Sequence, residues 1–298
     1  MLLTTDLPGR AIMQPSINTV EPVRTTEARA AWRQPWWGAT AWRAGTIALA
    51  SLSLLGLGLL AWYLLTVNHV VLWLRFDKVP TPGQVWATLI GQLTSRTFYF
   101  DLGASMRRIL LGFGLAAVLG TAVGIAVGRS TRVSMLVRPV IEVFRPIPAI
   151  ALVPLAILLF PTGEQGIVFI TFFAAFFPVA VSTIHAMHAL PTVWEEAART
   201  MGAGRRSILI HVVLPGAMPG IFAGLSVAMG VAWICVISAE MISGQFGIGY
   251  YTWQSYGLLD YPGVIVGMFS IGVLGLGTAW LVERVGRRIN RWLPRSER

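Results

Sequence analysis

The sequence predicts an all-α membrane protein with six transmembrane helices. Of its 298 residues, 55% are hydrophobic and only 12% are charged, against roughly 25% charged residues in a soluble domain. Apolar stretches of about 20 residues, the length needed to cross a hydrocarbon core of about 30 Å, recur along the chain. No segment alternates as barrel strands do, and an open sheet leaves backbone groups unsatisfied in lipid, so the spans are predicted to be helices.

The elements follow in chain order. Residues 1–44 are polar and arginine-bearing, which predicts a disordered cytoplasmic tail rather than a secretory signal. Residues 45–102 comprise the first span, at 45–65, and a long periplasmic segment. The core, residues 103–283, holds five further spans and a cytoplasmic loop at 188–214, and a basic cytoplasmic tail follows at 284–298. The five core spans are predicted at 103–128, 139–160, 165–187, 215–240 and 263–283.

Two spans carry local features beyond their hydrophobicity. Four prolines break the third span, and each frees a carbonyl that needs another partner; they are Pro146, Pro148, Pro154 and Pro161. Such a broken span fits a gate or a shape requirement of the fold. The second span carries Gly120, Gly124 and Gly128 at four-residue spacing, which favours close packing of one helix face.

The distribution of basic residues predicts the orientation. With both termini in the cytoplasm, seventeen arginines lie in the cytoplasmic segments, whereas only Arg75, Lys78 and Arg96 lie outside. This asymmetry also accounts for the net charge of +10. No basic stripe interleaved with aromatics is present, so we predict no nucleic-acid partner. The single cysteine, Cys235, lies in an apolar run and is predicted to be a packing residue.

The loop between the fourth and fifth spans predicts a short helix with defined ends. Thr192 is expected to be its N-cap, with Glu195 completing a capping box and Glu196 near the positive end of the helix dipole. Gly202 is expected to end the helix in the left-handed conformation. A capped helix on the arginine-rich side is more than a chain reversal needs, and it suggests a docking element.

This loop resembles the EAA loop of binding-protein-dependent ATP-binding cassette importer permeases. The resemblance rests on Glu196-Ala197-Ala198, on Gly202 four residues later, and on Val212 and Leu214-Pro215 at the family's distance. It extends over most of residues 80–293 and is most specific for the nitrate, sulfonate, taurine and bicarbonate permeases. The segments that carry this subfamily resemblance include Ser105-Met-Arg-Arg108, Arg145-Pro-Ile-Pro-Ala and Ala239-Glu240-Met241.

The resemblance implies a type I importer permease of the MetI-like architecture, in the cell inner membrane. It implies a coupling helix that docks on a separate ATPase, with Ala197 and Ala198 against the ATPase surface. The implied partners are two ATPase copies, which use ATP and Mg, and a periplasmic or lipid-anchored solute-binding protein. Because six spans show no internal duplication, we also expect a second copy of this chain. The implied coupling residues are Glu195, Glu196, Ala197, Ala198, Arg199, Gly202, Leu214 and Pro215.

The sequence argues against an enzyme or an ATPase. A P-loop requires a Gly-Lys-Ser/Thr element, but the only lysine, Lys78, is followed by Val79. His185 and His188 lie one turn apart without an H-E-x-x-H motif, so we predict no bound metal or cofactor in this chain. A secondary transporter remains the alternative, although it would need ion-coupling carboxylates near mid-depth. The carboxylates considered, Glu142, Glu240 and Glu283, fall near span ends.

Charged residues inside spans are candidates for the translocation pathway, because they usually face a protein interior or a wet cavity. An arginine can hold an oxoanion in its planar fork, but Arg145 lies one turn from Glu142, so an ion pair between them is the alternative. Glu240 is expected either to line the outer gate or to hold the glycine-rich loop at 244–249. The pathway candidates are Arg107, Arg108, Arg145, Ser238 and Glu240.

Overall fold

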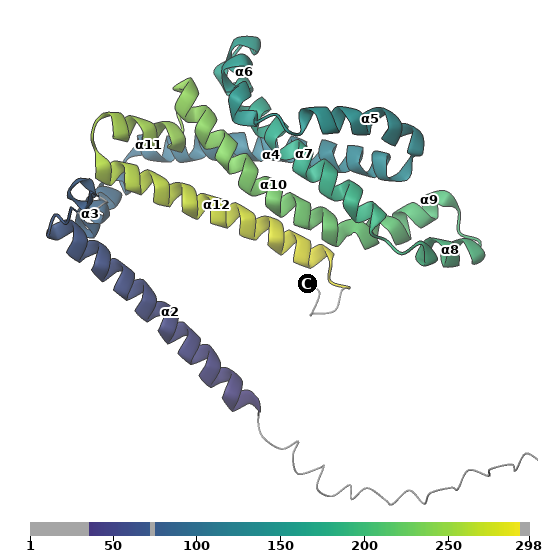
Figure 1. The fold of residues 1–298 in the computed structure, drawn as a ribbon, viewed down its shortest axis with the longest axis horizontal. Coiled ribbons are helices and arrows are strands. Elements are labelled where there is room, and N and C mark those ends of the chain that lie inside the picture. The colour runs from purple at the N-terminus through teal and green to yellow at the C-terminus, as the bar shows by residue number, and fades with distance from the viewer. Residues whose placement is uncertain (1–35, 72–74, 293–298) are drawn as a thin grey trace, which may run out of the picture. The chain divides into compact units, whose positions relative to one another are not determined.

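The computed structural model describes residues 36–71 and 75–292, in two units, residues 1–60 and 61–298. The described part of the first unit, residues 36–60, belongs to the apolar helix α2 (Trp36–Val67), which continues to residue 67 in the second unit (Figure 1). Of the tail predicted at 1–44, residues 1–35 lie outside the described residues, whereas residues 36–44 belong to α2. The second unit contains all the other helices.

Long helices dominate the chain, as predicted. Five helical segments are long and apolar enough to cross a membrane, and a bent pair brings the number to six if it counts as one span. They agree with the predicted spans but extend beyond several of them. The five are Leu49–Val67, α4 (Arg96–Arg129), α7 (Gly163–His188), the continuous run Arg205–Ser243 and α12 (Tyr261–Ile289).

The segment before α4 is partly helical. After the short turn η2 (Phe76–Lys78), helix α3 (Pro82–Leu93) begins with a capping box between Thr81 and Gln84, and Pro82 occupies the first turn. Val85 of α3 packs with Phe98, Ile248 and Val266 in a small core. This core joins α3 to α4, α12 and the short helix α11 (Ile248–Gly257).

Helices α4 and α7 run parallel and pack closely through glycines. A Cβ added at Gly112 would lie 2.6 Å from the Cβ of Thr171, and one at Gly124 would lie 2.5 Å from that of Thr183. Gly120 and Gly128 meet Val179 and Met187 in the same register. The predicted small-residue face of the second span is therefore its contact with α7, where glycine lets the two backbones approach.

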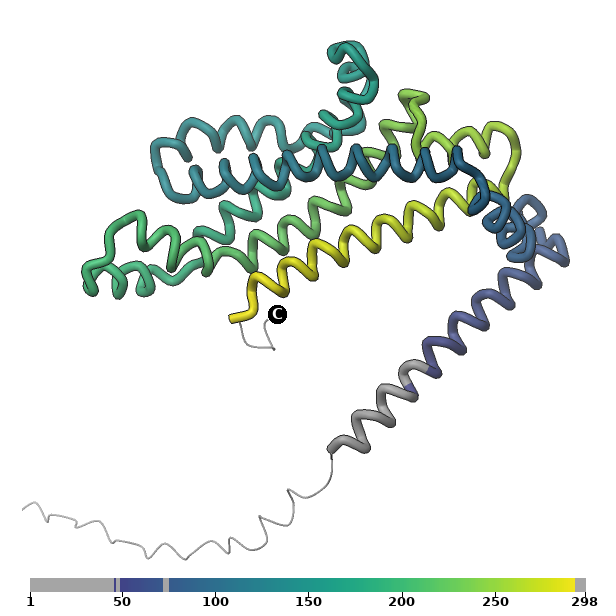
Figure 2. The backbone as a smooth tube through the Cα atoms, turned by 180° about the vertical axis from the view of Figure 1, so that it is seen from behind, coloured from purple at the N-terminus to yellow at the C-terminus, as the bar shows by residue number. Residues whose placement is uncertain are grey.

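Helix α10 (Leu214–Ser243) runs antiparallel to α7 and lies between α7 and α12 in both views (Figures 1 and 2). Gly220 of α10 faces Ala186, and Gly224 faces Ser182. On its other side, Trp233 donates a hydrogen bond of 2.8 Å to Thr278 of α12. The main core fills the space among α4, α7 and α10, and Cys235 packs in it, as predicted.

The third span is broken, as its prolines predicted. Helix α5 (Thr131–Phe144) ends before Pro146 and Pro148, and the helical turn η3 (Ala149–Leu152) with α6 (Val153–Leu159) continues at 82° to it. Because α4 and α7 are parallel, the segment between them must return to the side where α4 began. The bent pair therefore makes one crossing, the sixth.

Candidate functional site

The helix predicted in the loop at 188–214 is present as α8 (Thr192–Thr200), but its N-terminus differs from the prediction. Pro191 is the N-cap, Thr192 is the first helical residue, and no side chain caps the helix. The Glu195 carboxylate instead accepts a hydrogen bond of 2.5 Å from Arg129 at the end of α4, and Arg199 lies 3.7 Å from it. The predicted capping box was therefore wrong. The Glu195 carboxylate that it required is bonded to Arg129 of α4 instead.

The C-terminus of α8 agrees with the prediction. Gly202 has a φ of +84°, in the left-handed region that glycine adopts without a steric cost. The Gly202 N–H donates to the carbonyl of Arg199 at 2.9 Å, and the Ala203 N–H donates to that of Ala198 at 3.0 Å. These two bonds form a Schellman motif, which gives α8 a fixed end.

The two alanines of the predicted motif face opposite environments. Ala198 is buried in a small core with Met187, Ile208, Val213 and Ala217, so it faces the chain's own helices. We expected Ala198 to lie against the ATPase surface. This structure contradicts that expectation, because the chain's own helices cover the Ala198 side chain. Ala197 and Glu196 are exposed. They share the outer face of α8 with three other exposed residues, Val193, Thr200 and Met201.

The Leu214-Pro215 pair lies where a wider turn joins the loop to α10. The run from Arg205 passes through α9 (Arg205–Ile208) and a π-helical turn, η4 (Leu209–Val213). Pro215 has no N–H to donate to the carbonyl four residues back, and its ring crowds that carbonyl, which fits the wider turn preceding it. Leu214 packs on the same small core as Ala198. The pair thus fixes the start of α10 relative to α8.

A buried polar cluster lies at the opposite end of α4, α7 and α10 from α8. Arg108 of α4, with a side chain only 3% exposed, donates to Glu240 of α10 at 2.8 Å and to Glu164 of α7 at 2.5 Å and 2.8 Å. It also donates to the carbonyl of Phe246. Arg107 is exposed and pairs with the same Glu164 at 2.6 Å. Three helices therefore meet at one guanidinium.

The same cluster holds the glycine-rich loop after α10. Glu240, fully buried, accepts hydrogen bonds from Ser105 at 2.7 Å and from the Gly249 N–H at 2.9 Å. Asp101 accepts from the Gly247 N–H at 3.0 Å, and Ser105 accepts from the Ile248 N–H at 2.9 Å. Of the two roles expected for Glu240, this geometry shows the contact with the loop. The Ser238 hydroxyl donates to Ile234 in its own helix and is not part of the cluster.

Two carboxylates of this cluster, Glu164 and Asp101, were not among the candidates. Each lies near the start of its helix, Glu164 in α7 and Asp101 in α4, at positions typical of exposed polar residues. Only the parallel register of α4 and α7 brings Glu164 to Arg108. The signal available in the sequence was the pair of adjacent arginines in a span, which required carboxylates somewhere nearby.

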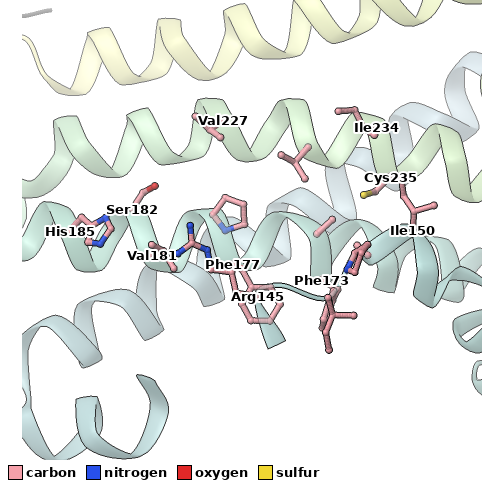
Figure 3. Close-up of a pocket in the computed structure, with 16 residues that line it drawn as sticks. Arg145, Ile150, Phe173, Phe177, Val181, Ser182, His185, Val227, Ile234 and Cys235 are labelled. Atoms are coloured by element: carbon pink, nitrogen blue, oxygen red, sulfur yellow. The ribbon is translucent and has the colours of Figure 1, made fainter. Parts of the chain in front are cut away.

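A cavity of about 570 Å³ lies between α7, α10 and the break after α5 (Figure 3). Most of its lining is apolar, including Phe173 and Phe177 of α7. Its polar side chains are Arg145, Ser182 and His185, with the Cys235 thiol. The predicted pair of Arg145 with Glu142 does not form, because Glu142 pairs with Arg138 at 3.0 Å within α5, whose helix ends before Arg145. Among the described residues, no group of three metal-ligating side chains converges.

The sequence matches a known family of membrane proteins. The family model described as "Binding-protein-dependent transport system inner membrane component" matches residues 116–291. A Brucella abortus protein described as an ABC transporter permease is 33% identical over 254 residues, 83% of this chain and 99% of that protein. The chain therefore belongs to the family of binding-protein-dependent transport system inner membrane components.

Named relatives and a solved structure add to this. A Methanocaldococcus jannaschii protein described as an ABC transporter permease is 43% identical over 58% of this chain and 65% of that protein. In Synechococcus elongatus, a bicarbonate transport system permease is 32% identical over 65% of this chain and 68% of its own length. A nitrate import permease there is 30% identical over 66% and 72%. The MetNI methionine transporter matches in fold, with a TM-score of 0.53 at 22% identity over 67% of this chain and 97% of that one.

Proposed function

We propose that this chain carries a small oxoanion across the inner membrane and is driven by a separate ATPase that docks on α8. The observation that carries the coupling proposal is the outer face of α8. Val193, Ala197 and Met201 follow one another at four-residue spacing, and Met201 is 80% exposed. An exposed apolar stripe on a short helix suits the helix-in-groove mode of recognition.

The attachment of α8 to the membrane helices supports its role in coupling. The ion pair of Glu195 with Arg129 joins it to α4, and the burial of Ala198 joins it to α7 and α10. The Schellman motif at Gly202 keeps its end fixed. A partner that displaced α8 would therefore displace three membrane helices, as rigid-body alternating access requires.

The proposed cargo follows from the relatives. Those described as bicarbonate and nitrate permeases handle planar, singly charged oxoanions. A solute-binding protein would deliver the anion, and two ATPase copies would use ATP and Mg, which this chain is not expected to bind. We also propose a second copy of this chain as the other half of the pathway, with both termini of each copy in the cytoplasm.

The buried cluster argues against the alternative, a secondary transporter. Ion coupling needs a carboxylate that is free to exchange protons or cations within the membrane. Glu240, the carboxylate of α10, is fully buried and bonded to Arg108, Ser105 and Gly249. Its contacts hold a loop rather than leave an exchangeable site.

The coupling proposal is tested with two variants of α8. Gly202→Val places a β-branched residue at φ +84°, and Glu196→Lys reverses a charge on the outer face. We expect both variants to reach the membrane at normal levels, while the ATPase activity that co-purifies with the tagged chain falls at least tenfold. Gly204→Ala is the matched control, because Gly204 has a φ of −75° and open space around it. Full ATPase recovery with both variants would contradict the proposal.

A further inference from the structure

The cavity of Figure 3 holds polar side chains that have no partner within the described chain. Arg145 forms no ion pair there, and neither the Ser182 hydroxyl nor the His185 ring forms a hydrogen bond. Other hydroxyls in the membrane helices donate to the carbonyl four residues back, as Thr183 does at 2.8 Å and Ser270 at 2.7 Å. Ser182 lies next to Thr183 and leaves this bond unmade, and its side chain lines the cavity where α7 packs against Gly224 of α10.

The unpaired arginine has an energetic consequence. A guanidinium within a transmembrane segment is costly unless water, a carboxylate or another anion solvates it. No aspartate or glutamate lines the cavity, and Glu142 is already bonded to Arg138. Arg145 and His185 are exposed. The guanidinium therefore places an uncompensated positive charge beside the largely apolar walls of the cavity, which favours anions over cations there.

We propose that Arg145, Ser182 and His185 form a subsite for a small oxoanion, such as nitrate or bicarbonate, along the path of the cargo. This inference rests on the proposed function and adds a binding site to it. The planar guanidinium matches two oxygens of a planar anion, and its fork distinguishes such an anion from a spherical halide. The Ser182 hydroxyl and the His185 imidazole supply further donors from α7, and Phe173 and Phe177 give the cavity an apolar wall.

The test uses the charge of the cavity itself as the readout. The single native cysteine is replaced by Cys235→Ala, and Val227→Cys then places a thiol at an exposed position on the opposite, α10 wall of the cavity. The purified chain in lipid nanodiscs is labelled with methanethiosulfonates that bear either a sulfonate or a trimethylammonium group. The ratio of the anionic to the cationic labelling rate reports the local potential.

Arg145→Gln is expected to lower this ratio about tenfold, because loss of one nearby charge changes each rate by roughly threefold in opposite directions. Nitrate is expected to slow labelling by the anionic reagent when Arg145 is present, and not in Arg145→Gln. Arg145→Lys should keep the ratio but lose most of the protection by nitrate, since the fork is gone. Arg138→Gln is the matched control, because Arg138 is paired with Glu142 and lies outside the cavity.

An unchanged ratio in Arg145→Gln would overturn the subsite, as would an equal change in Arg138→Gln or a thiol that neither reagent reaches. Uptake of labelled nitrate and bicarbonate by intact cells tests the proposed function separately. If cells with and without the chain take up both anions equally while the ratio still depends on Arg145, the cargo proposal fails and the subsite stands. If uptake requires the chain but is unaffected by Arg145→Gln, the subsite fails and the proposed cargo stands.

Discussion

Replacing Arg108 by methionine is expected to leave an uncompensated carboxylate in the buried polar cluster. The change removes the 2.8 Å bond to Glu240, the bonds to Glu164 and the donor to the Phe246 carbonyl. Glu164 is 30% exposed and keeps Arg107 at 2.6 Å, whereas Glu240 is fully buried and keeps only Ser105 and Gly249. Removing one partner of a buried pair costs about 3–5 kcal/mol.

The assay is the free energy of unfolding, measured by tryptophan fluorescence in dodecyl maltoside with increasing sodium dodecyl sulfate. Arg138→Met is the matched control, because the Arg138–Glu142 pair is exposed at both ends and such pairs contribute about 0.3–0.5 kcal/mol. In Arg108→Met/Glu240→Met the buried carboxylate is gone as well, and the double variant should be more stable than Arg108→Met. A loss below about 1 kcal/mol in Arg108→Met, similar to the control, would refute the reasoning.

Two further predictions concern packing and orientation. Gly124→Ala should lower the free energy of unfolding by about 1–3 kcal/mol, because its Cβ would lie 2.5 Å from that of Thr183. Gly114→Ala on the same helix meets open space and should not lower this free energy. Equal losses at both sites would contradict the parallel packing of α4 and α7. In a Cys235→Ala background, Gln245→Cys should react with an impermeant thiol reagent applied outside intact cells and Gly204→Cys should not, and the reverse pattern would overturn the predicted orientation.

The sequence predicted the membrane helices well, because the length of an apolar run decides whether it can cross a bilayer. The fourth span was predicted at 165–187 and is observed as Gly163–His188. The break in the third span was also predictable, since Pro146 and Pro148 cannot continue an α-helix. The angle of 82° was not, because it depends on how α5 and α6 pack against other helices.

Contacts between helices could not be predicted from local sequence patterns. The capping box at Thr192 failed because Arg129, 66 residues away, takes the Glu195 carboxylate. The predicted Arg145–Glu142 pair failed because the helix ends between the two residues and Arg138 lies one turn before Glu142. The burial of Ala198 depends on Val213 and Ala217, which the chain brings back only after the loop.

The glycine contacts between α4 and α7 have a mechanical consequence. Gly112, Gly120, Gly124 and Gly128 leave no flexible side chains between the two backbones, so the pair is expected to behave as one stiff rod. One end of this rod is attached to α8 through Arg129 and Glu195, and the other is held by Arg108. A displacement of α8 would therefore rotate the α4–α7 pair about the Arg108 cluster. The α7 wall of the Arg145 cavity would move with this pair.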